Sequence, residues 1–274
     1  MKVLLVNGSP HQHGCTYTAL AEITHTLQEE GIDSEIFWIG NKPIGGCIGC
    51  HGCIKLGKCA FDDDPVNAFT AKAKEADGFI FGSPVHYAAA TGNLTAFMDR
   101  VFYSDGCGKG RAFYLKPAAA VASARRAGTT ATLDQLNKYF TIAQMPVISS
   151  RYWNMVHGFT PEDVMKDLEG LQVMRVLARN MAYFLKCKAA GAAAGRPGTP
   201  LEYPQGSFKS QGIHTDFRGC ARLPGLRLQN RPAARAGRRI HSPVQTGRPS
   251  DRTERRAAAF RTQLKRMAGR TRNQ

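Results

Sequence analysis

Four cysteines stand close together in one glycine-rich stretch of the chain, "GGCIGCHGCIKLGKCA" (45–60). Cys47, Cys50 and Cys53 recur at every third position, and Cys59 follows after five intervening residues. Thiolates bind soft metal ions and iron–sulfur clusters, and they also take part in redox chemistry. The stretch therefore predicts that one loop carries a metal or redox centre.

Four interpretations of this cysteine loop compete. A zinc site usually pairs two C-x-x-C units across a longer spacer, so three cysteines at i, i+3 and i+6 suit zinc poorly. Disulfides are disfavoured because no export signal is visible, which leads us to expect a reducing cytosol. A 4Fe–4S cluster needs thiolates at several corners, and a glycine-rich C-x2-C-x2-C run can wrap it. The cluster is therefore the favoured interpretation, while unmetallated redox-reactive thiols and zinc stay open.

Three other stretches have the composition of ligand-binding turns. "NGSPHQHGCTYT" (7–18) offers backbone N–H groups, hydroxyls and the positive end of a helix, which together bind a phosphate. It lacks the lysine of a nucleotide P-loop, so a static monophosphate fits it best. "GSPVHYAAATGN" (82–93) combines two aromatic side chains with small residues that let a flat ring approach the backbone. "SARRAGTT" (123–130) places Arg125 and Arg126 where they would stabilise negative charge.

Strand-like and helix-like segments alternate through the first 190 residues. Short apolar runs that end at turn residues predict buried strands, and apolar positions three or four apart predict helices. Such alternation is typical of an open, mostly parallel sheet with helices on both faces. We predict strands at 2–8, 33–40, 77–84, 116–124 and 145–154, and helices at 16–31, 62–76, 91–102, 129–143 and 161–188.

The three turns follow the first, third and fourth predicted strands. Ligands of parallel sheets bind at the carboxyl ends of the strands, so we expect these turns to meet at one edge. Together they predict a mononucleotide pocket.

The segments "GSPHQHGCTYT", "GSPVHYAAATGNLTAFMDR" and "SARRAGTTATLDQLNKYF" resemble, in this order, those of the NADPH-dependent FMN reductase and iron–sulfur flavoprotein family. The resemblance covers roughly residues 1–190. It implies a flavodoxin-like three-layer α/β sandwich over residues 1–195, with a five-stranded parallel sheet in the order 2-1-3-4-5. The C-x2-C-x2-C-x5-C spacing also matches the compact cysteine pattern of the iron–sulfur flavoproteins.

The resemblance also implies which residues hold FMN. Those implied around the phosphate are Ser9, His11, Gly14, Cys15 and Thr16. Those implied along the flavin ring and ribityl chain are Ser83, Pro84, Val85, His86, Tyr87 and Ala88, with Ser123, Ala124, Arg125 and Gly128 at the far edge of the ring. The cluster ligands would be Cys47, Cys50, Cys53 and Cys59. Cys15 replaces the asparagine usual in the family, and because a thiol is a weak donor we expect a lower phosphate affinity.

The implied function is that of a cytoplasmic FMN-dependent NAD(P)H oxidoreductase. NAD(P)H, or a ferredoxin if the cluster is present, would reduce FMN, and electrons would pass to a quinone, a flavin or another small acceptor. No catalytic acid or base is expected from the protein. An alternative is an iron–sulfur flavoprotein that carries electrons between a 4Fe–4S cluster and FMN without substrate turnover. A homodimer or a higher homo-oligomer is also expected.

The basic charge of the chain is concentrated in its last part. Residues 1–195 carry 19 Lys and Arg against 17 Asp and Glu, whereas residues 196–274 carry 18 against 4. This tail is rich in Arg, Pro, Gly and Ala, so we expect it to be disordered or to derive from a shifted reading frame. Polyanion binding by the tail is a second alternative function, although we expect no nucleic-acid partner.

Two further expectations concern membranes and the remaining cysteines. No stretch is long enough to cross a bilayer, so we expect no membrane partner. Cys107 falls in a predicted loop after a helix, and neither it nor Cys187 nor Cys220 shows a partner pattern.

Overall fold

The computed structural model describes residues 1–108, 110–196 and 198. The predictions for the arginine-rich tail from residue 199 on lie outside these residues. The strands are β1 (Lys2–Asn7), β2 (Asp33–Trp38), β3 (Gly78–His86), β4 (Ala89–Ala90), β5 (Ala118–Ala124) and β6 (Met155–His157). The helices are α1 (Cys15–Glu29), α2 (Gly52–Leu56), α3 (Val66–Glu75), α4 (Gly92–Cys107), α5 (Thr129–Ile142), α6 (Pro161–Val164) and α7 (Leu168–Ala193).

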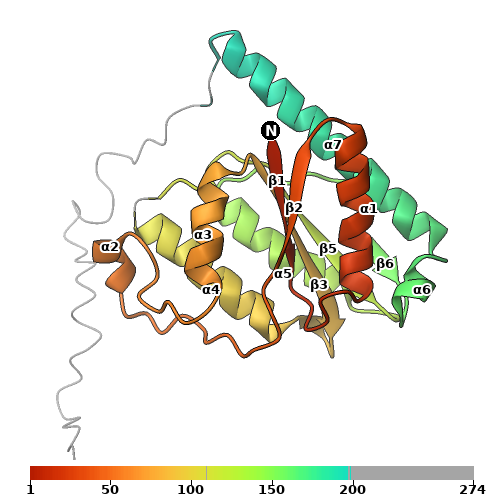
Figure 1. Ribbon diagram of the computed structural model, residues 1–274, viewed down its shortest axis with the longest axis horizontal. Helices are drawn as coiled ribbons and strands as arrows, with labels where there is room; N and C mark the ends of the chain where they lie inside the picture. The colour runs from red at the N-terminus through yellow and green to blue at the C-terminus, as the bar shows by residue number, and fades with distance from the viewer. Residues whose placement is uncertain (109, 197, 199–274) are drawn as a thin grey trace, which may run out of the picture. The chain divides into compact units, whose positions relative to one another are not determined.

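Five of the strands form a parallel sheet in the order β2-β1-β3-β5-β6 (Figure 1). The sixth strand, β4, has two residues and pairs antiparallel with the end of β3. Without β4, the strands follow the predicted order 2-1-3-4-5. The predicted sheet is therefore confirmed, with one short strand added.

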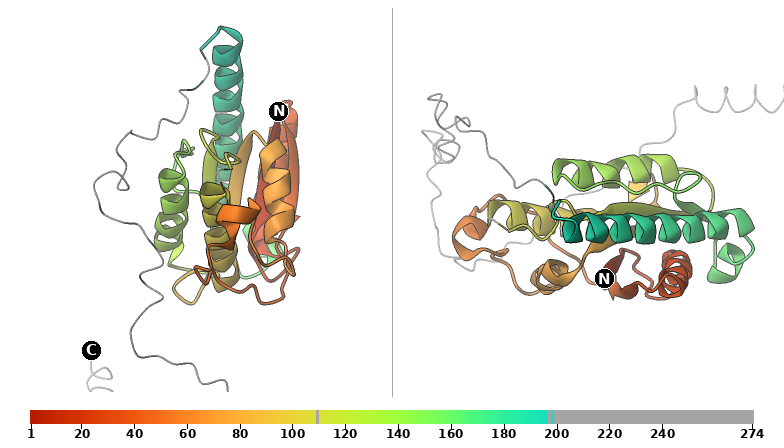
Figure 2. Two further views of the ribbon diagram at one scale, coloured as in Figure 1. Left: turned by 90° about the vertical axis from the view of Figure 1, so that its left-hand side faces the viewer. Right: turned by 90° about the horizontal axis from the view of Figure 1, so that it is seen from above.

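Helices cover both faces of the sheet (Figure 2). Val3 and Leu5 of β1 belong to an apolar core with α1 and α7, whereas Leu4 and Val6 belong to a second core with α3, α4 and α5. Because both faces of the central strands are buried, these strands are apolar throughout and do not alternate with polar residues. None of the helices in the described part of the chain has the length and apolar composition that crossing a membrane requires.

Two glycines let the ends of β1 and β3 lie close together. Gly8 N donates to Gly82 O at 2.8 Å. A Cβ atom at Gly8 would lie 2.8 Å from Leu94 Cδ2, and one at Gly82 would lie 2.8 Å from Thr16 Cγ2. Both distances are too short for a carbon contact. Glycine at position 8 therefore lets α4 approach the end of β1, and glycine at position 82 lets the start of α1 rest against β3.

The position predicted for the fifth strand is wrong. Residues 145–154 form only an isolated bridge, between Val147 and Ala118, and strand β6 begins at Met155. The segment bonds to β5 through Pro146 O and Ile148 N, and bonds to it again through Asn154 O. Its apolar and aromatic composition is strand-like, but the described residues between 148 and 154 make no backbone hydrogen bonds of a strand with β5.

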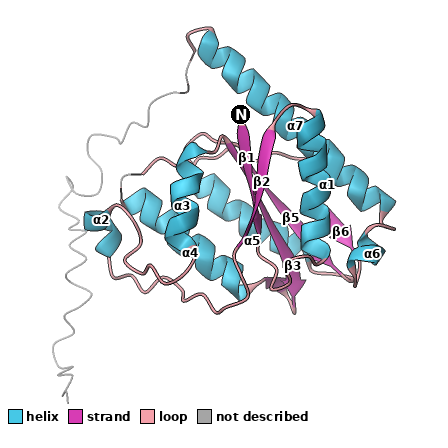
Figure 3. Ribbon diagram, in the orientation of Figure 1, coloured by secondary structure: helices cyan, strands magenta, loops and turns pink. Residues whose placement is uncertain are grey.

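The predicted single helix over 161–188 is also wrong, because α6 and α7 are separate. Asp167 starts α7 as an N-cap, since its Oδ1 accepts from Gly170 N at 2.9 Å. Thr160 and Asp163 form a capping box at the start of α6. The cysteine loop is irregular apart from the short helix α2 (Figure 3), and Cys107 ends α4 instead of lying in a loop.

Candidate functional site

The turns after β1, β3 and β5 meet at one edge of the sheet and line a single pocket. The loop between β6 and α6 completes its wall. The pocket holds about 1520 Å³ of empty space open to solvent, which is ample for a mononucleotide. The predicted residues that line it are Ser9, His11, Gly14, Cys15, Thr16, Pro84, Val85, His86, Ser123, Ala124 and Arg125.

Hydrogen bonds shape the turn between β1 and α1. Asn7 Oδ1 accepts from Ser9 N (3.0 Å), Asn7 Nδ2 donates to Gln12 O (2.9 Å), and His11 N donates to Ser9 Oγ (3.1 Å). No side chain caps the N-terminus of α1, and its first turn holds no acidic residue. Burial raises the pKa of the Cys15 thiol, so this side chain stays neutral at pH 7. The positive end of α1 therefore opens on the pocket, which is an arrangement that binds phosphate.

Two side-chain hydrogen bonds tie this turn to neighbouring strands. The buried hydroxyls of Thr16 and Ser123 lie 2.8 Å apart, which links α1 to the end of β5. Trp38 Nε1 donates to Ser9 O at 2.8 Å from the end of β2. Trp38 also lines the pocket, although it was not predicted as a site residue. Its place at the carboxyl end of a strand beside β1 was the signal available in the sequence.

The end of β3 contributes Pro84, Val85 and His86 to the pocket, but not all the residues predicted there. Ser83 lies behind the wall, where its Oγ donates to Pro84 O (2.8 Å) and accepts from Thr91 N (3.0 Å). Tyr87 has a left-handed backbone (φ +59°) and a fully exposed side chain. Tyr87, Ala88 and Gly128 do not line the pocket.

Arg125 reaches the pocket from the end of β5. Its guanidinium carbon lies 5.9 Å from the centre of the Phe159 ring, which favours a cation–π contact. Phe159 belongs to the β6–α6 loop, and all three loop residues (158–160) line the pocket together with Pro161 at the start of α6. The sequence does not predict this loop as part of the site, because the strand-like composition of 145–154 places the fifth strand too early. Arg126 does not line the pocket.

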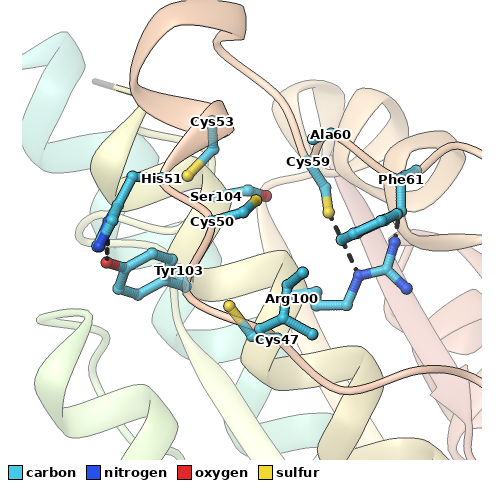
Figure 4. A pocket seen from close by; sticks show the side chains of 11 residues that line it. Cys47, Cys50, His51, Cys53, Cys59, Ala60, Phe61, Arg100, Tyr103 and Ser104 are labelled. Atoms are coloured by element: carbon cyan, nitrogen blue, oxygen red, sulfur yellow. Dashed lines mark hydrogen bonds between the residues drawn. The ribbon is translucent and has the colours of Figure 1, made fainter. Parts of the chain in front are cut away.

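A second pocket, which shares no lining residue with the first, lies between the cysteine loop and α4. It holds about 310 Å³ of empty space, and the sulfur atoms of Cys47, Cys50, Cys53 and Cys59 face this space (Figure 4). Left-handed backbone conformations at Gly49, His51 and Gly57 bend the loop around it. The four cysteines that the spacing groups therefore line one pocket, and their role as cluster ligands stays a prediction.

The donor set of this pocket fits an iron–sulfur cluster. Among the described residues, its lining contains four thiols, the imidazole of His51 and no carboxylate. Within the described residues, no group of three His, Cys, Asp or Glu side chains is arranged to hold a metal ion. A zinc ion needs four ligands that converge on one point, whereas a cluster distributes its thiolates over several irons. Four thiolates can hold an iron–sulfur cluster, so the donor set fits a cluster, and zinc stays an alternative.

Cys107 and Tyr103 of α4 lie beside the same pocket. Burial and a hydrogen bond to Cys107 raise the pKa of Tyr103 to about 12. Burial, followed by the charge of Cys107, raises the pKa of the Cys53 thiol. Tyr103 Oη also lies 3.2 Å from His51 Nδ1. This grouping is not predicted from the sequence, because the predicted helix ends at residue 102. Only the longer helix α4 brings Cys107 to this side.

Comparison with known proteins agrees with this geometry. Residues 1–160 match the family described as NADPH-dependent FMN reductase. An iron–sulfur flavoprotein of Methanocaldococcus jannaschii is 34% identical over 195 residues, covering 68% of this chain and 98% of the relative. A second iron–sulfur flavoprotein of that organism is 29% identical over 201 residues, covering 69% and 98%.

Solved structures share the fold. The crystal structure of RosB with bound 8-demethyl-8-formylriboflavin-5'-phosphate is similar with a TM-score of 0.56 at 14% identity, covering 90% of this chain and 100% of that one. At such identity the likeness shows the fold alone, and the predicted flavodoxin-like fold is confirmed. The family match, which spans more than half of the chain, shows more than the fold. With the M. jannaschii relative at 34% identity, it establishes that the chain belongs to the NADPH-dependent FMN reductase family.

Proposed function

We propose that the chain binds FMN in the pocket at the carboxyl edge of the sheet and acts as an FMN-dependent oxidoreductase. The observation that carries this proposal is the uncapped start of α1, which opens on a pocket large enough for a mononucleotide. Membership of the FMN reductase family supports it independently.

Three groups of pocket residues would contact different parts of FMN. The phosphate side is Ser9, His11, Gly14, Cys15 and Thr16, and the ring and ribityl side is Pro84, Val85 and His86, with Ser123, Ala124 and Arg125 at the far edge. Ser83, Tyr87, Ala88 and Gly128 stay in the proposal as parts of the turns that border these sides.

FMN, when bound, supplies hydride and single-electron transfer. The residues of the chain supply position and charge. Thr16, bonded to Ser123, sets the distance between the phosphate turn and the end of β5. Arg125 brings a positive charge that would stabilise negative charge on a reduced ring. No residue is assigned as a catalytic acid or base.

NAD(P)H is the proposed electron donor, and a quinone, a flavin or another small molecule is the proposed acceptor. The opening of the pocket to solvent supports this, because it leaves room for a second planar molecule. The description of the family names NADPH. A cytoplasmic homodimer or higher homo-oligomer completes the proposal.

A second candidate function is electron transfer between FMN and a 4Fe–4S cluster, without substrate turnover. The observation that favours it is the pocket lined by Cys47, Cys50, Cys53 and Cys59. Both M. jannaschii relatives are named iron–sulfur flavoproteins. A ferredoxin would then serve as a donor or partner.

Anaerobic purification with assays of flavin, iron and sulfide tests both candidates. We expect bound FMN and about four irons per chain. Steady-state NAD(P)H oxidation with a quinone then separates them, because an oxidoreductase turns over and a pure carrier shows almost no activity. Protein that neither contains FMN nor binds added FMN would contradict both.

Matched variants assign the two sites. Arg125→Gln is expected to weaken FMN binding or slow turnover, whereas Arg126→Gln, outside the pocket, is the control. Cys47→Ser is expected to lower the iron content and leave the flavin content unchanged. Cys187→Ser, at an exposed position on α7, is its control.

A further inference from the structure

A buried arginine of α4, Arg100, joins the two ends of the cysteine loop. Its side chain is only 3% exposed. Nη1 donates to Gly45 O at 3.2 Å, and Nη2 donates to Phe61 O at 3.1 Å. Nη1 also forms an ion pair with Asp64. The guanidinium carbon lies 5.5 Å from the centre of the Phe61 ring. One side chain therefore fastens the loop where it begins and where it ends.

The third nitrogen of this guanidinium, Nε, points to a cysteine sulfur. Arg100 Nε lies 3.3 Å from Cys59 Sγ (Figure 4). The backbone of Cys59 is held as well, since its N–H donates to Asn67 Oδ1 and its carbonyl accepts from Asn67 Nδ2, both at 3.0 Å. Cys59 and Cys53 are buried, whereas Cys47 and Cys50 are exposed. Cys59 is thus clamped through both its backbone and its sulfur.

An N–H donor and a positive charge beside a ligand sulfur have a known physical effect. Hydrogen bonds to the sulfurs of a cluster and the net charge around it set its reduction potential. Reduction adds negative charge, and a buried cation stabilises that charge more than an exposed cation does, because water screens it less. Asp64 pairs with Nη1 and leaves Nε directed at the sulfur.

We propose that Arg100 is a positioning residue for the redox centre of the cysteine loop. It fixes Cys59 as a buried ligand and raises the reduction potential of the centre held by Cys47, Cys50, Cys53 and Cys59. This inference rests on the proposed 4Fe–4S cluster. The couple takes up one electron from an external reductant, which is dithionite in the test, and no proton moves at Arg100.

The test is an anaerobic dithionite titration followed by EPR of the reduced centre. Arg100→Lys keeps the charge but cannot make the same set of bonds, so we expect it to retain iron and to titrate at a lower potential than wild type. Arg100→Gln is expected to titrate lower still or to lose most of its iron. Arg175→Gln is the control. Arg175 forms a partly exposed ion pair with Glu22 between α7 and α1 and lines neither pocket, so this variant should have the wild-type iron content and reduction potential. Flavin content reports whether each variant has folded.

Each outcome decides a different question. Iron-replete Arg100→Lys protein with the wild-type potential and EPR spectrum overturns the role of Arg100 and leaves the cluster intact. Wild-type protein that takes up no iron contradicts the proposed cluster, and this inference with it.

A measurement on wild-type protein covers variants that fail to fold. Pulsed EPR of the reduced centre in protein with ¹⁵N-labelled arginine guanidinium should detect nitrogen coupling through the Nε–H···Sγ bond. A cluster without this coupling overturns the inference.

Discussion

At the residue scale, the shape of the proposed flavin pocket, which the turns after β1, β3 and β5 line, depends on Trp38. The bond from its Nε1 to Ser9 O ties the end of β2 to the turn between β1 and α1, which is the proposed phosphate site. Ser9 is itself buried, and its Oγ accepts from His11 N. These bonds hold the turn in one conformation before a ligand arrives, which lowers the cost of ordering it on binding.

We predict that Trp38→Phe weakens FMN binding several-fold. Loss of the Ser9 bond removes about 1 kcal/mol, which is about a five-fold change in affinity. Titration of FMN-free protein, followed by flavin fluorescence, measures this. Trp153→Phe is the control, because Trp153 is exposed and does not line the flavin pocket. An unchanged affinity in Trp38→Phe would mean that the turn keeps its shape without this bond.

At the element scale, the close packing of β1, β3 and α4 positions the turns that line the proposed flavin pocket. We predict that Gly8→Ala destabilises the fold, because its Cβ would lie 2.8 Å from Leu94 Cδ2 and 2.9 Å from Gly82 O. Overpacking of this kind costs about 1–3 kcal/mol of the free energy of unfolding. Urea denaturation measures it. Gly92→Ala is the control, since nothing lies within 4 Å of its added Cβ. Equal stabilities of the two variants would contradict the prediction.

Strand β2 at the edge of the sheet is held by charge. Glu35 lies 2.7 Å from both Lys2 Nζ and Lys72 Nζ. The hydrogen bonds from Lys2 and then Lys72 lower the pKa of Glu35 below its ordinary value of 4.5. A lowered pKa in the folded state means that Glu35 stabilises the fold above its ordinary pKa, and that this contribution is lost as pH falls through the lowered value.

We therefore predict that Glu35→Gln lowers the thermal midpoint at neutral pH and that the gap to wild type closes on acidification. Melting curves from neutral pH to below pH 4 measure the gap. Glu169→Gln is the control, because Glu169 is exposed and its nearest basic partner, Arg151, lies 4.0 Å away. A gap that stays constant down to the lowest pH would contradict the assignment.

At the scale of the whole molecule, the two cores on either side of the sheet are built from residues between Val3 and Leu185. We predict that a chain ending at residue 198 keeps the FMN content, iron content and thermal midpoint of the full chain. Spectroscopy and thermal melts on both proteins measure this. Loss of flavin or iron on truncation would contradict it. If the full chain binds nucleic acid in a salt-sensitive way and the shorter chain does not, the tail has a function of its own.

Periodicity and turn residues predicted most of the fold. Hydrophobic runs and glycine-bearing turns reported strands β1, β2, β3 and β5 and the three turns at their carboxyl ends. The cysteine spacing grouped the four thiols. These predictions succeed because burial and turn geometry determine the residue types of positions that are close together in the chain.

Only the tertiary structure decided the contacts between distant segments. Strand β6 lies after the aromatic stretch 152–153, because pairing with β5 resumes only there. Trp38 meets Ser9 across 29 residues, and Arg100 meets Cys59 across 41. A hydrogen bond of this kind depends on where two elements pack. The local sequence around Trp38 or Arg100 does not distinguish a side chain that makes such a bond from one that is exposed to solvent. The sequence alone thus determined the strand order, four of the five strands, the turn between β1 and α1 and the grouping of the four thiols, while packing decided the place of β6 and the side chains that hold these parts.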